Sequence, residues 1–285
     1  MREVLSYGGG LDSFAMLLLT AIADGAPPEV CVFVDVSDGT APGEWPGTYR
    51  HMREVVMPLC AAHGIEFVWL DTESYPVRGA SSLFAWMQAR HQIPVAGPNR
   101  ICTRIAKVER FERWMADRFP GEDVRVWIGF EAGEERRAAQ DPNAGEEKGH
   151  RKNRFPLIEK GLCRCRCEAL VRAAGYPVPR KSACVFCPYG SLTDWKTLAR
   201  ELPAVFAEVA RLEVDKPPTR SGKKLSIMGY RSTKDADGNV TGYRAPPLPL
   251  YVQGRPTGKR KPCAVCGAEV RATKATACGY LEDAA

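Results

Sequence analysis

The stretch L-S-Y-G-G-G-L-D-S-F-A-M-L-L-L, residues 5–19, decides the fold class that we expect for this chain. A short apolar strand, Val4–Tyr7, leads into three glycines, and a helix is expected from about Asp12 to Ala23. Glycine lets anion oxygens approach the main chain, and a helix N-terminus offers N–H donors to them. The stretch therefore predicts a phosphate-binding turn; the alternative is an ordinary glycine-rich turn between a strand and a helix.

Strand and helix patterns alternate through the first 130 residues. Apolar runs predict further strands at Val30–Val36, Ile65–Leu70 and Val124–Phe130, with helices at Tyr49–His63 and around residues 105–115 between them. Strands that alternate with helices imply right-handed crossovers and a parallel sheet covered on both faces. We therefore expect an α/β fold, a doubly wound parallel sheet.

Such folds bind ligands at the carboxyl ends of their strands. This rule places the glycine turn, Asp35 and the segment Gly129–Glu135 along one rim of the sheet. Four basic side chains, Arg104, Lys107, Arg136 and Arg137, are candidates for neutralising phosphate or sulfate; the alternative is solvated surface charge.

Composition narrows the class of protein. The chain has 285 residues, a net charge of +6 and 45% apolar residues, enough for a core. No apolar run reaches the length of a membrane span, so we expect a cytoplasmic protein without a membrane partner. Eleven cysteines in such a protein favour metal or redox use over a disulfide framework.

We expect three regions along the chain. Residues 1–155 form the nucleotide-binding α/β domain, residues 156–213 a cysteine-rich, metal-binding helical region, and residues 214–285 an irregular basic extension with a cysteine knuckle. Residues 131–154 are polar and lack periodicity, which predicts a loop, with His150 on its surface. Ser191 and Asp194 are typical of a capping box that opens a helix.

The glycine turn resembles the S-G-G-x-D-S loop of the ATP pyrophosphatase (PP-loop) superfamily, also called adenine nucleotide alpha-hydrolase-like, of the HUP fold type. One residue departs from the pattern: Gly8 stands where that loop has its first serine, so the contact of that hydroxyl is either lost or taken over by Ser6 or Ser13. The resemblance implies that ATP or phosphoadenosine phosphosulfate, with Mg²⁺, binds here. The residues it assigns to nucleotide binding are Ser6, Gly8, Gly9, Gly10, Asp12, Ser13, Asp35 and Gly129.

Three more segments resemble the phosphoadenosine phosphosulfate reductase-like branch of that superfamily. Asp35–Tyr49 is similar to its D-T-G…E…P-E-T-Y segment, Asn99–Lys107 to its R-x-C-T-x-x-x-K segment, and Trp127–Arg137 to its G-x-x-x-x-E-x-x-R segment. The resemblance covers roughly residues 3–196. The catalytic roles that it implies fall on Asp12, Ser13, Lys107 and Arg137.

The cysteines between Cys163 and Cys187 predict a metal centre. Cys184-x-x-Cys187-Pro lets two thiolates hold one metal, and spacing alone does not choose zinc or iron–sulfur. Segments 156–159 and 181–188 resemble phage and DNA-modification members of the branch, which implies a [4Fe-4S] cluster. The expected ligands are Cys102, Cys167, Cys184 and Cys187, with Cys163 and Cys165 as substitutes for Cys102. The alternative is a reduced structural set.

A second cysteine group lies near the C-terminus. Cys263, Cys266 and Cys278 make half of a zinc ribbon, with Asp283 as a conceivable fourth ligand. The alternative is a reduced tail that binds no metal.

The sequence supports three functions. The first is an enzyme that adenylates an acceptor, DNA or tRNA being favoured, releases pyrophosphate and transfers sulfur from a donor protein. The second is a phosphoadenosine phosphosulfate reductase, disfavoured because A-C-G-Y (Ala277–Tyr280) lacks the Glu and His that flank the catalytic cysteine in those enzymes. The third is a catalytically silent nucleotide-binding module with structural zinc in a nucleic-acid complex. A homodimer is a further expectation.

Overall fold

The structure is a computed structural model that describes most of the chain. The described residues are 1–96, 100–144, 150–218, 220, 222, 225–228, 231–234, 240–244, 247–253 and 265–266. Asn99, Cys263, Cys278, Asp283 and the A-C-G-Y segment lie outside them.

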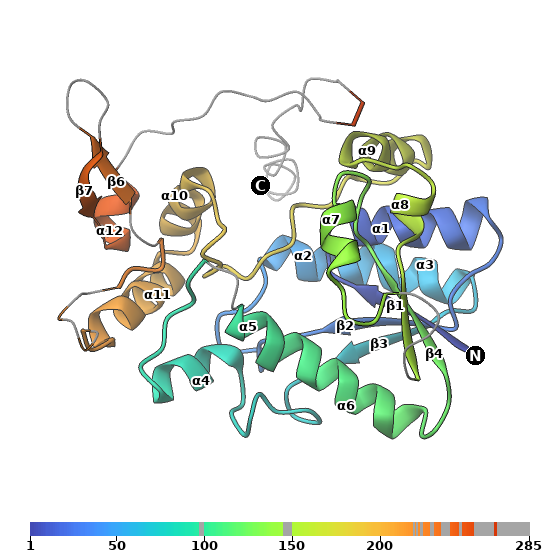
Figure 1. Cartoon of the computed structure of the whole chain (residues 1–285), viewed down its shortest axis with the longest axis horizontal. Coiled ribbons are helices and arrows are strands. Elements are labelled where there is room, and N and C mark those ends of the chain that lie inside the picture. Colours follow the sequence, from blue (N-terminus) through green and yellow to red (C-terminus); the bar gives the residue numbers. More distant parts are fainter. Residues whose placement is uncertain are drawn as a thin grey trace.

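A five-stranded parallel sheet forms the centre of the molecule (Figure 1). Its strands are β1 (Arg2–Tyr7), β2 (Val30–Val34), β3 (Glu66–Leu70), β4 (Val124–Ile128) and β5 (Arg151–Arg154), in the order β3-β2-β1-β4-β5. The order reverses at β1, whose neighbours are β2 and β4. The predicted α/β parallel sheet is therefore confirmed, and the glycine turn leaves the central strand at this reversal.

Helices follow most of the strands. They are α1 (Leu11–Leu18, continued by a π-helical turn at Leu19–Ala23), α2 (Pro46–His51), α3 (Met57–Ala62, joined to α2 by a π-helical turn at Met52–Val56), α4 (Leu83–Ala89), α5 (Ile101–Thr103), α6 (Glu109–Arg118, joined to α5 by a π-helical turn at Arg104–Val108), α7 (Glu135–Ala139), α8 (Pro156–Glu159), α9 (Arg164–Ala173), α10 (Leu192–Glu201), α11 (Pro203–Asp215) and α12 (Leu248–Tyr251). None of the described helices combines the length and the apolar character that a membrane crossing requires.

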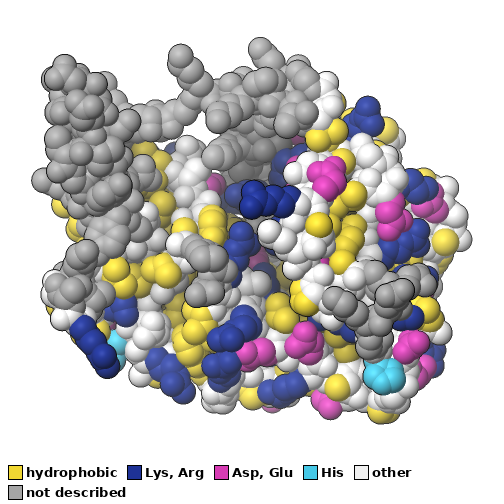
Figure 2. Space-filling model, viewed as in Figure 1, with side chains coloured by type: hydrophobic (Ala, Val, Ile, Leu, Met, Phe, Trp, Pro, Cys, Tyr) yellow, Lys and Arg dark blue, Asp and Glu magenta, His cyan; other side chains and the backbone are white. Residues whose placement is uncertain are grey.

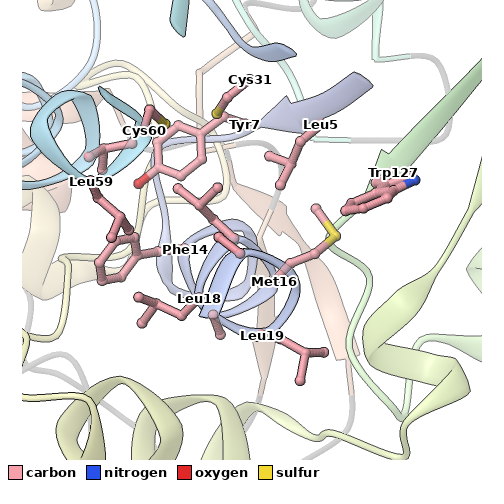
Figure 3. Packing of buried hydrophobic residues seen from close by; sticks show 14 of the residues in the cluster. Leu5, Tyr7, Phe14, Met16, Leu18, Leu19, Cys31, Leu59, Cys60 and Trp127 are labelled. Atoms are coloured by element: carbon pink, nitrogen blue, oxygen red, sulfur yellow. The ribbon is translucent and has the colours of Figure 1, made fainter. Parts of the chain in front are cut away.

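The two faces of the sheet are covered by different helices because alternate residues of a strand point to opposite faces. Leu5 and Cys31 belong to the cluster formed with α1, α3 and α9 (Figure 3). Val4 and Val30, one residue earlier on each strand, belong to the cluster formed with α6. Both faces are thus buried, as the apolar strands predict.

A third hydrophobic cluster lies beyond the sheet. It joins α4, α10, α11 and α12 with Val185 and Phe186 of the cysteine segment. The predicted capping box opens α10: Ser191 Oγ accepts from the Asp194 N–H, and the Asp194 carboxylate accepts from the Ser191 N–H. The cysteine segment therefore lies where this cluster meets the rim of the sheet.

Two predicted irregular regions contain regular structure. The expected loop at residues 131–154 holds α7 and the edge strand β5, and residues 214–262 hold a hairpin of β6 (Arg231–Lys234) and β7 (Val240–Arg244) followed by α12. β5 reads R-K-N-R, so it carries no apolar alternation, and its pairing with β4 makes it a strand. An edge strand tolerates such polar residues because its outer side is not covered by a further strand; here, within the described residues, that side forms only an isolated bridge, in which the Asn153 N–H donates to the Asn143 carbonyl.

Candidate functional site

Ser13 fixes the shape of the glycine turn. Its hydroxyl accepts a hydrogen bond from the Gly8 N–H at 3.2 Å and donates one to the Gly10 carbonyl at 3.0 Å. Of the two serines proposed to replace the missing hydroxyl at position 8, Ser13 is the one that contacts this position, while Ser6 lies within β1. A Cβ at Gly8 would have room, with its nearest neighbour, Ser13 Oγ, at 3.8 Å.

Close approach of other segments explains the remaining glycines of the turn. Gly9 has φ +77°, and a Cβ there would lie 2.8 Å from Thr48 Cγ2. A Cβ at Gly10 would lie 2.8 Å from Ser182 Oγ, and one at Gly129 would lie 3.0 Å from the Ser13 nitrogen. Segments that follow β2 and β4 and the segment that precedes Cys184 therefore meet at the turn.

Asp12 is partly buried beside the turn, in the first turn of α1. One oxygen, Oδ2, accepts from Arg164 of α9 at 3.0 Å, while Oδ1 is buried and has no hydrogen-bond partner among the described residues. Burial raises the pKa of Asp12; Arg164 opposes this shift, and Glu134 adds to it. Oδ1 could thus coordinate a cation.

Asp35 follows β2 and is buried in a network of its own chain. Its carboxylate accepts from the Tyr49 hydroxyl at 2.7 Å, the Trp69 indole N–H at 3.0 Å and the Ser37 N–H at 3.1 Å. Tyr49 and Trp69 stack with their rings 5.6 Å apart. Burial and the Asp35 charge raise the pKa of Tyr49 far above its usual 10.0, so its phenol stays protonated and donates. Asp35 therefore orients two aromatic rings at the rim.

Lys107 forms an ion pair with Glu44 near two cysteines. Its Nζ lies 3.0 Å from Glu44 Oε1, and the Glu44 side chain is 1% exposed. The Cys184 thiol contacts the same oxygen at 4.0 Å. Burial lowers the pKa of Lys107, but Glu44, Cys184 and Cys187 raise it by more, so the amine stays charged. Lys107 therefore already has a carboxylate partner, and its expected contact with phosphate or sulfate stays a prediction.

The structure brings together three of the four predicted cluster ligands. Cys102 and Cys184 pack against the same hydrophobic cluster, and Cys102 and Cys187 add to the effect of burial in raising the pKa of Cys184. Burial raises the pKa of Cys184 and of Cys187. Cys167 lies elsewhere, on α9 in the core beneath α1, with Cys163 as a neighbour. The sequence places Cys167 in one dense cysteine run, but the α9 helix turns its thiol into the core.

A different cysteine trio forms at the start of α9. The sulfur atoms of Cys163, Cys165 and Cys266 all lie within 4.8 Å of one another. Cys266 is thus paired with the C-R-C run and not with a local knuckle, while Cys263 and Cys278 fall outside the described residues.

The predicted arginines lie at the edge of the site. Arg137 is half-exposed, pairs with Glu134 at 3.0 Å and lies over the Phe130 ring at 4.1 Å. Arg104 is more exposed and has Glu109 at 3.8 Å. His150 is exposed, as predicted, with Nδ1 3.2 Å from Asp123. Figure 2 shows Lys and Arg side chains beside a hollow near the middle of this face.

Arg110 is a residue that sequence reasoning missed. Its guanidinium is buried and donates to the carbonyls of Asp35, which follows β2, of Leu70 and Asp71 at the end of β3, and of Tyr75 and Ala106. It therefore holds the end of β3 against the end of β2, where Asp35 lies. The one available signal is that Arg110 falls on the apolar face of α6 with Phe111 and Trp114.

The described residues fit a bound phosphate–metal group at the turn. Three buried oxygens there, Asp12 Oδ1, Glu44 Oε2 and Thr48 Oγ1, have no hydrogen-bond partner among the described residues. Buried polar atoms are nearly always satisfied, so such atoms along one rim indicate a ligand. Another surface pocket, of about 620 Å³, is lined by residues of β4, α7 and β5 and contains none of the predicted site residues.

Comparisons with known proteins give a structural similarity. The chain matches no protein-family model and no curated protein sequence. Its structure is similar to that of a phosphoadenylyl-sulfate (PAPS) reductase from Candida auris in complex with phosphate, with a TM-score of 0.43 and 16% identity. The match covers 63% of this chain and 76% of the reductase. The fold class rests on the sheet itself, since a likeness of this size decides neither substrate nor reaction.

Proposed function

We propose that the chain is a nucleotide-dependent enzyme of sulfur chemistry, of the PP-loop, phosphoadenosine phosphosulfate reductase-like kind. In this proposal an adenylyl nucleotide binds with its phosphates on Gly8–Ser13. The observation that carries it is the set of three buried oxygens beside the turn that have no hydrogen-bond partner within the described part of the chain. These atoms support a bound group that contributes phosphate oxygens and a metal cation.

The turn supplies the phosphate contacts. The first N–H groups of α1 have no acceptor within the helix, and the helix dipole favours an anion at this end. Ser13 already holds the main chain of Gly8 and Gly10, so the turn is shaped before a ligand arrives. Binding then costs little reorganisation, which favours the transition state as well as the ground state.

Mg²⁺ fits beside the turn at Asp12. The ion keeps several waters and is usually held by one or two carboxylates together with substrate phosphates. Arg164 occupies one oxygen of Asp12, and the second, Oδ1, is the atom left for the ion. The raised pKa of Asp12 follows from burial, and a bound cation would favour its ionised form.

Cys102, Cys184 and Cys187 are the proposed ligands of a [4Fe-4S] cluster. The described thiols of this group are not gathered as tightly as the sulfurs around a single ion, which suits a cluster whose thiolates bind different irons. Three protein ligands leave one iron able to hold a sulfur species, which is the chemistry that the cluster would supply. Lys107 lies beside Cys184 and would offset the negative charge of the thiolates.

The proposed reaction has two steps. An acceptor oxygen bonds to the α-phosphorus, the bond from that phosphorus to the bridging oxygen of the β-phosphate breaks, and pyrophosphate leaves. Sulfur at the hydrosulfide level, brought by a donor protein, then replaces the adenylated oxygen, and AMP departs with it. Lys107 and Arg137 would stabilise the leaving charge. The favoured acceptor is a nucleic acid, DNA or tRNA, because the chain is basic and ends in a basic extension.

A labelling experiment tests this proposal. Protein purified without oxygen is incubated with γ-labelled ATP, Mg²⁺, sulfide and total tRNA or DNA, and the label is separated as pyrophosphate or phosphate. We expect pyrophosphate and AMP in equal amounts. Gly9→Ala should abolish the release because its Cβ would collide with Thr48.

Two outcomes would replace this function by another. Sulfite formed from phosphoadenosine phosphosulfate and a thiol reductant, with no pyrophosphate from ATP, would identify a reductase. Nucleotide binding without either product would identify the catalytically silent module. Release of phosphate in place of pyrophosphate would contradict the proposed attack at the α-phosphorus.

A further inference from the structure

Cys163, Cys165 and Cys266 come from segments a hundred residues apart in the sequence and converge at the N-terminus of α9. We propose that these three thiolates bind one Zn²⁺ ion, which fastens the C-terminal segment to the α/β domain. This site is separate from the proposed nucleotide and iron–sulfur chemistry and does not depend on it.

The start of α9 favours thiolates. Cys163 is the residue that precedes the helix, with extended dihedral angles of φ −78° and ψ 167°, and Cys165 lies in the first turn. Both sulfurs therefore lie at the positive end of the helix dipole, which stabilises the ionised thiol. Cys163 is buried and Cys165 partly exposed, so the two sulfurs span the boundary between core and solvent.

The C-terminal segment reaches this place through a second contact. A Cβ at Gly133 would lie 3.3 Å from Val265 Cγ2, so the residue before Cys266 packs on the loop after β4. The same loop holds the start of α9, because Glu131 accepts from the Arg164 N–H at 2.7 Å. Figure 1 shows residues 265–266 beside α9. The position of Cys266 is thus consistent with a docked segment.

The spacing of the sulfurs selects a single ion. Two thiolates on a tetrahedral zinc with Zn–S bonds of about 2.3 Å lie about 3.8 Å apart. All three sulfurs here lie within 4.8 Å of one another, so small movements reach that geometry. A cubane cluster needs wider spacing because each thiolate binds a different iron. Thiolate ligands without other donors favour zinc over magnesium or calcium.

The fourth coordination position is left to water or another donor. In the sequence Cys263 precedes Cys266 in a C-x-x-C pair, the spacing at which two thiolates hold one metal. Residue 263 lies outside the described residues, and the proposal does not depend on it.

Metal analysis of full-length variants tests the site. We expect one zinc per chain in the parent protein and in Cys167→Ala, the matched control on the same helix. In Cys266→Ser we expect zinc affinity to fall by at least about 100-fold. Cys266 is exposed, so its replacement leaves the core intact. If Cys167→Ala does not fold, Cys60→Ala, at a core position away from the trio, takes its place as the control.

Alkylation of Cys266 gives a readout that is independent of any activity. With zinc bound, iodoacetamide should modify Cys266 slowly, and a strong chelator should speed the modification by about tenfold or more. The proposal is overturned if the parent holds no zinc, if Cys266→Ser keeps it, or if a disulfide joins two of the three cysteines in the purified protein. Iron is counted in the same samples, so a failed cluster and a failed zinc site are told apart.

Discussion

The two cysteine groups of this protein differ in their surroundings. Cys184 touches a buried carboxylate that is paired with Lys107, and unpartnered buried oxygens lie nearby. The trio of Cys163, Cys165 and Cys266 is tighter and reaches the surface at Cys266. The comparison teaches that the two groups differ in which charges they adjoin: Cys184 contacts the Glu44 carboxylate that Lys107 neutralises, whereas the trio lies beside Arg164, which forms an ion pair with Asp12.

The largest expected effect is the selective loss of iron when one ligand of the proposed cluster is replaced. Cys184→Ser should remove the iron completely and leave the zinc, because Cys184 is a proposed cluster ligand and not a member of the trio. Iron and zinc are measured by mass spectrometry with a visible spectrum of the anaerobic protein. Loss of both metals from this variant would show that the two groups are one site.

Lys107→Met should have the next largest effect. It leaves the Glu44 carboxylate buried without its cation, which should lower the free energy of unfolding by about 2 kcal/mol. The loss should stay below that of a fully buried pair because a third of Lys107 is exposed, 33%. Pyrophosphate release should fall by about 100-fold. Urea unfolding and the labelling assay measure the two effects.

Two controls accompany the Lys107 variant. Arg118→Met breaks an exposed pair with Glu66 and should change stability by less than about 0.5 kcal/mol. Combining Lys107→Met with Glu44→Gln should restore much of the stability but not the activity. If the double variant is no more stable than the single one, Glu44 is not the group that Lys107 neutralises.

The same substitution at neighbouring glycines should have unequal effects. Gly9→Ser combines a positive φ with a Cβ 2.8 Å from Thr48, so it should cost about 2 kcal/mol. Gly8→Ser restores the serine of the resembling motif where a Cβ has room, and should change stability by less than about 0.5 kcal/mol. Thermal unfolding measures both. Equal losses would mean that the turn is not shaped as described.

The smallest expected effect concerns Asp12 and pH. Burial raises the pKa of this carboxyl above its usual 3.8 in the folded protein, so its contribution to stability is full at low pH and is lost as pH rises through the raised pKa. Arg164→Met should deepen that loss by about 1 kcal/mol at pH 7 and have little effect where Asp12 is protonated. Unfolding curves between pH 3 and pH 8 measure it.

The sheet could be predicted because its signals are local. Val4–Tyr7 and Val30–Val34 are apolar runs bounded by glycine or polar residues, and the glycines after β1 mark the turn. The polar edge strand β5 could not be predicted, because its four residues carry no apolar pattern and its pairing with β4, far away in the sequence, defines it.

The sequence could predict individual segments of the candidate site, but not which cysteines lie together in space. The glycine turn and Asp35 follow β1 and β2 at one rim, as the rule for parallel sheets leads one to expect. Lys107 and Cys184 do not follow strands, so this rule did not place them. Sequence proximity misled for Cys167, because Cys163 precedes α9 and Cys167 lies a turn later on its buried face. Cys266 lies about a hundred residues after Cys165 in the sequence, and no sequence pattern predicts that the two sulfurs lie close together in space.

The ion pair between Arg164 and Asp12 has a thermodynamic consequence. Arg164 stands between two of the proposed zinc ligands, and its guanidinium holds an oxygen of the carboxylate beside the glycine turn, 3.0 Å away. If zinc changes the position of Arg164, it changes the affinity of the turn for nucleotide, and nucleotide must then change the affinity for zinc by the same factor. Zinc occupancy would thereby report, through a single side chain, whether the C-terminal segment is docked.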